Sequence, residues 1–144
     1  MIVTFCGHRD TWDAGNEISK WLTKTVGQLI EEGATEFYLG GYGRFDALAA
    51  KAVCEAKKTH PHIRSVLVVP YLNRDYHNRS YDETVYPPIE RVPMRLAIIK
   101  RNEYMVDCAD VVVSGVTRSF GGAVQTLEYA EKKNKRIIAF NGSE

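Results

Sequence analysis

The chain has 144 residues, of which 44% are hydrophobic and 26% charged, a balance that suits one compact domain and excludes a disordered or fibrous segment. Nineteen Lys and Arg against eighteen Asp and Glu give a formal charge of +1, which argues against a nonspecific nucleic-acid binder. Its apolar runs are far shorter than the roughly 18 residues of a membrane span. We therefore expect a single domain over residues 1–144, with no membrane partner and nucleic acid disfavoured.

The first residues lack the basic, apolar and small-residue pattern of a secretory signal, so we expect a cytoplasmic protein. Cysteine usage agrees with that expectation. Cys6, Cys54 and Cys108 are odd in number and form no Cys-x-x-Cys pair, which favours thiols in a reducing compartment over a disulfide framework.

Strand and helix signals alternate along the chain. Short β-prone runs predict strands at residues 2–6, 37–39, 66–69, 111–114 and 137–140. Apolar residues at helical spacing predict helices at residues 18–30, 48–56, 96–107 and 123–133. Apolar strands separated by helices pair in parallel, with helices on both faces. The pattern therefore predicts a three-layer α/β fold with a mainly parallel sheet of about five strands.

Residues 70–93 interrupt this alternation, with four of the five prolines, four of the eight tyrosines and no sustained period. We expect an ordered flap here, because aromatic side chains supply packing surface. The flap contains Tyr71, Tyr76, Tyr81 and Tyr86, together with Arg74 and Arg79. These residues suit stacking over a bound base, and they equally suit an oligomer interface.

Ligands of an open parallel sheet bind beyond the carboxyl ends of the strands, so the strand-to-helix loops are the candidate sites. In the first loop, Gly7 is followed by His8 and Arg9, two potential phosphate ligands. The second loop contains Gly40, Gly41, Gly43, Arg44 and Asp46. The third runs from residue 115 to residue 122 and opens the last predicted helix.

The second loop differs from the dinucleotide fingerprint G-x-G-x-x-G, because Asp46 replaces the third glycine and the loop follows the second strand. Its glycines still permit close approach of the backbone to a ligand, and a helix N-terminus offers N–H groups to a phosphate. Asp46 has two interpretations, a helix cap or a ligand for ribose hydroxyls.

The third loop is the better phosphate candidate. Ser119, Gly121 and Gly122 precede a helix, with Thr126 and Glu128 in its first turns, so backbone amides are placed to bind an anion. The alternative is that the two glycines only form a tight turn.

Two arginines belong to the preceding predicted helix, Arg95 at its start and Arg101 within it, and each is either a solvated surface residue or a phosphate ligand. A metal site is not indicated. His60-Pro61-His62 lacks a nearby third ligand and predicts a turn, so we expect neither metal nor cofactor.

Four segments together resemble the SLOG superfamily, the Rossmann-like group that unites DprA-type DNA-processing proteins, Lonely Guy-type phosphoribohydrolases and YpsA-like proteins. They span nearly the whole chain and are residues 5–9, 40–46, 101–107 and 121–130. The Gly7-His8-Arg9 start and the Arg101-Asn102-x-x-Met105 stretch look closest to the YpsA-like branch.

The resemblance implies candidate catalytic residues. Lonely Guy-type enzymes hydrolyse the N-glycosidic bond of nucleoside monophosphates with an arginine four residues before a methionine and a glutamate closing the motif P-G-G-x-G-T-x-x-E. Arg101 and Glu128 match those positions. Phe120, Val124 and Gln125 replace the proline, third glycine and threonine, so the phosphate-binding part is altered. Glu128 would stabilise an oxocarbenium-like state while Arg101 orients the phosphate or base.

Three function hypotheses follow. The first is a sensor or sink that binds a nucleotide or an ADP-ribose-like phosphorylated ribosyl ligand. The second is an N-glycoside hydrolase acting on nucleoside monophosphates, and the third, disfavoured by the near-neutral charge, is DprA-like binding of single-stranded DNA. From related proteins we expect a homodimer or higher homo-oligomer. The ligand-binding residues predicted beside the Arg101 and Glu128 pair are Gly7, His8, Arg9, Gly40, Gly41, Gly43, Arg44, Asp46, Arg95, Asn102, Ser119, Gly121, Gly122 and Thr126.

Overall fold

A computed structural model describes residues 1–72 and 81–141, which form a six-stranded, all-parallel sheet in the order β4-β3-β2-β1-β5-β6. The strands are β1 (Ile2–Gly7), β2 (Glu36–Leu39), β3 (Arg64–Val68), β4 (Glu83–Val85), β5 (Val111–Gly115) and β6 (Arg136–Ala139). The helices are α1 (Glu17–Glu31), α2 (Arg44–Thr59), α3 (Ala97–Cys108) and α4 (Gly122–Lys132), with short 3-10 helices η1 (Ala14–Asn16) and η2 (Met94–Leu96). The predicted α/β fold is confirmed, with one strand more than expected.

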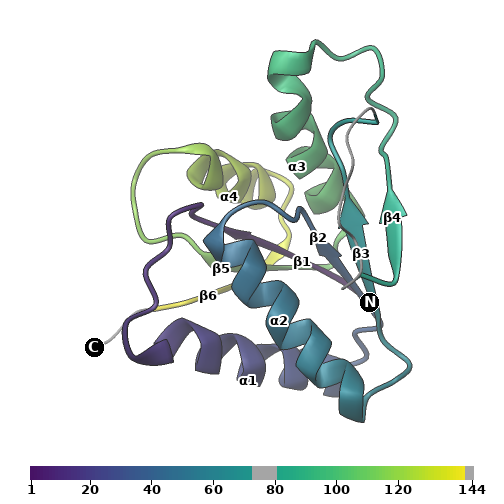
Figure 1. Cartoon of the computed structure of the whole chain (residues 1–144). Coiled ribbons are helices and arrows are strands. Elements are labelled where there is room, and N and C mark those ends of the chain that lie inside the picture. Colours follow the sequence, from purple (N-terminus) through teal and green to yellow (C-terminus); the bar gives the residue numbers. More distant parts are fainter. Residues whose placement is uncertain (73–80, 142–144) are drawn as a thin grey trace.

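Figure 1 shows α1 and α2 on one face of the sheet and α3 and α4 on the other. Alternation along β1 explains how both faces become covered, because successive side chains of a strand point to opposite faces. Val3 and Phe5 pack into the cluster under α1 and α2, whereas Cys6 packs with Val106 and Val112 on the α3 and α4 side. The three predicted layers are therefore present.

The start of α1 is stabilised by the side chain of Asp13, three residues before the N-cap residue Asn16. The carboxylate of Asp13 accepts hydrogen bonds from the backbone N–H groups of Ile18 at 2.6 Å and Ser19 at 3.2 Å. These donors lie in the first turn, where N–H groups have no partner within the helix.

None of the helices within residues 1–72 and 81–141 combines the length and the hydrophobicity that a membrane span requires.

The sixth strand, β4, lies within the segment for which the sequence predicts a flap. It pairs in parallel with β3, with Val68 opposite Val85. Its three residues include one charged and one exposed polar side chain, so no strand signal is visible in the sequence. Asp82, just before β4, accepts the backbone N–H of Ser65 at 2.8 Å and pairs with Lys57, which joins this edge to α2.

Part of the predicted flap lies outside the described residues, namely Arg74, Tyr76 and Arg79. Tyr81 is partly buried against the core cluster under α1 and α2, and Tyr71 and Tyr86 are also partly buried. The role of residues 70–93 as a flap stays a prediction.

The strand order reverses between β1 and β5, and this reversal determines where a ligand can enter the edge of the sheet. β1 leads into α1 on one face, and β5 leads into α4 on the other. Gly7 and Gly115 are paired at the carboxyl ends of the two strands. A crevice at such a reversal is the usual ligand site of open α/β sheets.

Candidate functional site

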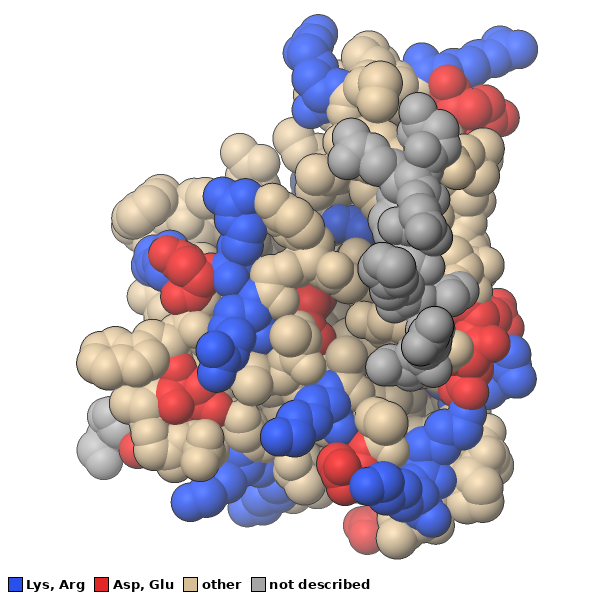
Figure 2. All heavy atoms as spheres, viewed as in Figure 1, with Lys and Arg blue, Asp and Glu red and all other residues tan. Residues whose placement is uncertain are grey.

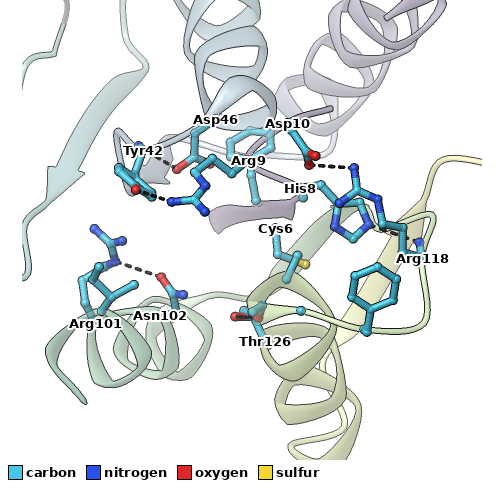
Figure 3. A pocket seen from close by; sticks show the side chains of 17 residues that line it. Cys6, His8, Arg9, Asp10, Tyr42, Asp46, Arg101, Asn102, Arg118 and Thr126 are labelled. Carbon is cyan, nitrogen blue, oxygen red and sulfur yellow. Dashed lines mark hydrogen bonds and ion pairs between the residues drawn. The ribbon is translucent and has the colours of Figure 1, made fainter. Parts of the chain in front are cut away.

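A cavity of about 480 Å³ opens beyond the carboxyl end of β1, within the size range of small-molecule sites. We call it the central cavity (Figure 3). Its walls come from the loop after β1, the loop after β2, α3, and the loop and first turns of α4. Its lining residues are Phe5, Cys6, Gly7, His8, Arg9, Asp10, Tyr42, Asp46, Ile98, Arg101, Asn102, Arg118, Phe120, Gly121, Gly122, Ala123 and Thr126.

The N-terminus of α4 opens into the central cavity. Gly121, Gly122 and Thr126 line it, and no side chain caps the helix. Gly121 has φ of 105°, and a Cβ placed on either glycine meets no atom within 4 Å, so open space lies beside this backbone. Free N–H groups and the positive end of the helix dipole make such a terminus an anion site. The third loop is thus placed where a phosphate could reach its amides, and its phosphate role stays a prediction.

The N-terminus of α2 differs, because its first amides are already bonded within the protein. The backbone N–H of Arg44 donates to the carbonyl oxygen of Arg9 at 2.8 Å, and that of Phe45 to the carbonyl oxygen of His8 at 3.4 Å. Those amides are therefore not available to a phosphate. Gly40, Gly41, Gly43 and Arg44, which the sequence predicts as ligand-binding, are not among the residues that line the central cavity.

Gly41 and Gly43 instead have conformational roles. Their φ values of 67° and 95° lie in the left-handed region that favours glycine. A Cβ on Gly43 would also lie 2.8 Å from Arg9 Cα. These two glycines shape a tight loop that brings the chain back to the first strand-to-helix loop.

Asp46 caps this loop and not the helix that contains it. Its Oδ2 accepts the backbone N–H groups of Gly40 at 3.1 Å and Tyr42 at 3.5 Å, whereas the start of α2 has no side-chain cap. The carboxyl group is half-buried on the wall of the central cavity. Burial raises the pKa of Asp46 to about 6, although the nearby Arg101 guanidinium and the backbone amides lower it. The helix-cap interpretation is thus replaced by a loop cap that also faces the ligand space.

Arg101, a predicted catalytic residue, is only 3% exposed and is held by the ends of two strands. Its Nη1 donates to the carbonyl oxygens of Gly40 at 3.0 Å and Val68 at 2.8 Å, and its Nε donates to Asn102 Oδ1 at 2.9 Å. A Cβ on Gly40 would lie 3.1 Å from Arg101 Cζ. Gly40 therefore admits the guanidinium group, which is fixed at the cavity wall before any ligand binds.

His8 organises the third loop through its ring. The side chain is 5% exposed, and its Nε2 accepts the backbone N–H groups of Thr117 at 3.0 Å and Arg118 at 3.2 Å. A ring nitrogen that accepts hydrogen bonds carries no proton, so His8 is neutral with its proton on Nδ1. Burial and then the charge of Arg118 lower the pKa of His8, whereas Asp10 raises it. His8 lines the cavity as a neutral support and not as a cation, and its predicted contact with a ligand stays a prediction.

Two basic side chains flank the cavity opening (Figure 3). Arg9 Nη1 donates to the hydroxyl of Tyr42 at 2.6 Å, and its guanidinium lies 5.4 Å from the centre of that ring. Arg118 forms an ion pair with Asp10, with 2.6 Å between Nη2 and Oδ1. Figure 2 shows basic and acidic side chains side by side around a hollow on this face.

Sequence reasoning missed Tyr42, Arg118, Asp10 and Phe120 as site residues. All four lie in or directly beside the three loops already singled out, and that position is the signal the sequence offers for them. Pairing of Asp10 with Arg118 spans 108 residues of chain, so no local pattern contains it.

Besides the residues of the second loop, three further predicted site residues do not line the central cavity. Glu128 is exposed on α4, two residues beyond Thr126 and therefore on roughly the opposite side of the helix. Ser119 and Arg95 are exposed and do not line the cavity either. The predicted pair of Arg101 and Glu128 is thus separated, and the carboxylates of the cavity are Asp46 and Asp10.

Comparison with known proteins begins with sequence. No family model matches the chain. Relatives include the uncharacterised prophage-derived protein YoqJ of Bacillus subtilis, 27% identical over 136 residues, and a UPF0398 protein of Halalkalibacterium halodurans, 28% identical over 132 residues. The matches cover 77% and 83% of this chain, and 78% and 70% of the two relatives.

Solved structures share the fold at low sequence identity. DNA processing protein A from Streptococcus pneumoniae gives a TM-score of 0.72 at 18% identity, over 98% of this chain and 50% of that one. DNA processing protein A from Helicobacter pylori, described for its single-stranded DNA binding mode, gives 0.67 at 16% identity, over 96% and 64%. TM1055 gives 0.65 at 19% identity, over 98% and 74%. These likenesses show that the chain shares its fold with DNA processing protein A and with TM1055, as the resemblance in sequence leads us to expect.

Proposed function

We propose that this SLOG-type domain binds a nucleotide or an ADP-ribose-like phosphorylated ribosyl ligand in the central cavity, as a sensor or sink. The observation that carries the proposal is the uncapped N-terminus of α4, which opens into a cavity lined by Arg9, Arg101 and Arg118. A helix N-terminus beside guanidinium groups favours a phosphate over neutral ligands, because both supply donors and positive charge.

Each part of such a ligand has a complementary wall. The phosphate lies on the amides that begin at Gly122, within reach of Arg118 or Arg9 on the rim. Asp46 accepts hydrogen bonds from ribose hydroxyls on the opposite wall, since an ionised carboxylate is an acceptor only. The base contacts the exposed ring of Phe120 and the side chain of Ile98, which are 69% and 37% exposed in the free protein.

A substitution at Gly122 tests the phosphate position without disturbing the fold. Gly122→Asp adds a carboxylate at the helix N-terminus, where a Cβ meets no atom within 4 Å and where acidic residues stabilise a helix. Gly122→Asn is the matched control, because it has the same shape and no charge. Calorimetric titration with AMP measures the affinity of both variants and of the wild type.

We expect the Asn variant to bind AMP nearly as well as the wild type, and the Asp variant to bind at least about tenfold more weakly, which corresponds to about 1.4 kcal/mol. Equal affinity of the two variants places the phosphate elsewhere. No binding of AMP or ADP-ribose by the wild type at millimolar ligand removes the proposal itself.

N-glycoside hydrolysis remains the alternative, because the cavity contains a carboxyl group of raised pKa, Asp46, close to Arg101. Incubation with AMP and chromatographic detection of adenine tests it. Release of adenine that is lost in Asp46→Asn and kept in Glu128→Gln assigns the reaction to the cavity carboxylate. Release lost only in Glu128→Gln assigns it to the residue that the sequence motif predicts.

Two further predictions from the sequence, binding of single-stranded DNA and formation of a homo-oligomer, have tests of their own. A gel-shift titration with a single-stranded oligonucleotide tests DprA-like binding, which the charge of +1 disfavours. Sedimentation equilibrium tests the predicted homo-oligomer, for which Met94 on η2 and Ile98 and Ile99 on α3 supply exposed apolar surface.

A further inference from the structure

A second cavity of about 320 Å³ lies next to the central cavity and shares three of its lining residues, His8, Asp10 and Arg118. We call it the adjacent cavity. It is formed by the loop after β1, the start of α1, and the carboxyl ends of β5 and β6. Its other lining residues are Thr11, Trp12, Asp13, Ala14, Glu17, Ile18, Gly115, Thr117 and Phe140.

The two cavities lie on opposite sides of the point where the strand order reverses. The central cavity reaches α4, which follows β5, and the adjacent cavity reaches α1, which follows β1. A long ligand of an open α/β sheet crosses this reversal, with one half on each side. The shared wall is the ion pair between Asp10 and Arg118.

The ionisable side chains of the cavities differ. The central cavity is lined by three arginines, Arg9, Arg101 and Arg118, and by two carboxylates, Asp10 and Asp46, and it also has an uncapped helix N-terminus. Asp10, Asp13 and Glu17 line the adjacent cavity, where Arg118 is the one guanidinium among the described lining residues. A phosphate is therefore favoured in the central cavity and repelled by the carboxylates of the adjacent one.

Aromatic surface marks the adjacent cavity. The side chain of Trp12 is 86% exposed, which is a large fraction for a tryptophan, since this side chain is usually mostly buried. Phe140 lies on the same cavity and packs edge-on against Trp21, with 5.3 Å between the ring centres. An exposed indole beside hydrogen-bond acceptors suits a planar ring that carries hydroxyl or amino groups.

We infer that the adjacent cavity binds the distal, uncharged nucleoside or ribose half of a two-part ligand, such as ADP-ribose or a dinucleoside diphosphate, with its ring against Trp12. The inference rests on the proposed function and extends it, because it selects two-part diphosphates over mononucleotides. The diphosphate lies between the two cavities, beside Asp10 and Arg118, and its oxygens replace the Asp10 carboxylate as the partner of Arg118. Glu17 accepts hydrogen bonds from the hydroxyl or amino groups of the distal half.

Calorimetric titration with AMP and with ADP-ribose tests the inference in the wild type, in Trp12→Ala and in Trp12→Phe. The distal half of ADP-ribose is a ribose without a base, so the face of its sugar ring packs on the indole, and a tenfold change in affinity corresponds to about 1.4 kcal/mol. We expect ADP-ribose to bind the wild type at least about tenfold more tightly than AMP, and Trp12→Ala to remove that difference while AMP affinity stays unchanged. Trp12→Phe, which keeps a ring, retains most of it.

Fluorescence gives a second readout that does not depend on affinity. The chain has two tryptophans, so Trp21→Phe leaves Trp12 as the only indole and keeps an aromatic ring beside Phe140. ADP-ribose should change the emission of Trp12 in this variant, and AMP should not.

The outcomes separate the two proposals. Equal binding of AMP and ADP-ribose, with no effect of Trp12→Ala and no change in Trp12 emission, overturns the inference and leaves the proposed function standing. Absence of binding for both ligands removes the proposed function and the inference with it.

Discussion

The ring of Phe45, the second residue of α2, lies so close to Gly7 that a Cβ on this glycine would be 2.2 Å from Phe45 Cγ. Gly115, its partner across β1 and β5, faces the other edge of the ring, with a Cβ placed 2.2 Å from Cε1. Phe45 is 1% exposed. Two strand ends and the first turn of α2 thus meet around one side chain, directly beneath the central cavity.

Gly7→Ala should destabilise the fold by about 1 to 3 kcal/mol, because overpacking forces the ring of Phe45 from its position. Chemical denaturation measures the change. Gly27→Ala is the matched control: Gly27 lies within α1, a Cβ there meets no atom within 4 Å, and alanine should stabilise the helix by about 0.5 to 1 kcal/mol. Equal stability of both variants would contradict the packing argument.

His8 should act on stability through its acceptor nitrogen. His8→Ala removes the acceptor for two backbone N–H groups, so we expect a loss of about 2 kcal/mol at pH 7.5. His8→Gln supplies a side-chain oxygen in place of Nε2 and should recover part of this loss. Nitrogen-15 NMR of the imidazole should show the proton on Nδ1; a protonated Nε2 would disprove the assignment.

The pH dependence of His8 has a defined sign. Its pKa is lowered in the folded state, chiefly by burial, so the unfolded chain binds a proton more readily as the pH falls below 6.5. The free energy of unfolding should therefore decrease from pH 6.5 downward in the wild type. In His8→Gln this decrease should be smaller, as thermal melts at several pH values will show.

Asp46 has the opposite sign. Its pKa is raised from 3.8 to about 6 in the folded state, so between those pH values the folded state keeps a proton that the unfolded chain releases. This group makes the protein less stable as the pH rises from about 4 to 6. Asp46→Asn should be more stable than the wild type at pH 7, on the order of 2 kcal/mol, because the charge is no longer half-buried.

The same variant should bind AMP more weakly, since the amide is a poorer acceptor for ribose hydroxyls than the carboxylate. A stability difference between Asp46→Asn and the wild type that does not change from pH 4 to 7 would contradict the raised pKa. Calorimetry on both proteins at pH 7 gives the binding comparison.

Cys6 should be unreactive although it lines the central cavity. Burial raises the pKa of its thiol to about 12, against a smaller opposing effect of the hydrogen bond with Ser114. The thiolate is the reactive form, so alkylation at pH 8 should modify the exposed Cys54 first and leave Cys6 intact in the native protein. Mass spectrometry of the peptides measures the order, and rapid labelling of Cys6 would refute it.

The order and type of the main elements could be predicted from the sequence, because hydrophobic periodicity is a local property that burial on a sheet or helix face requires. Residues 111–113, for example, lie under helices on both faces of the sheet and are all valine. β4 could not be predicted, since its pairing with β3 depends on the edge of the sheet and not on its own side chains. Of the site, the third loop was predicted because glycines before a helix have a local meaning.

What the sequence by itself determined is therefore the layered fold and the loops that end near its ligand edge. Only the tertiary structure decided which of those loops is open. The carbonyl oxygens of His8 and Arg9 accept hydrogen bonds from the first backbone N–H groups of α2, whereas the start of α4 has no side-chain cap and lines the cavity. Those bonds join residues about 35 positions apart, and Asp46 replaces Glu128 at the cavity for the same reason. Proximity in a folded sheet depends on strand order, which no local spacing encodes.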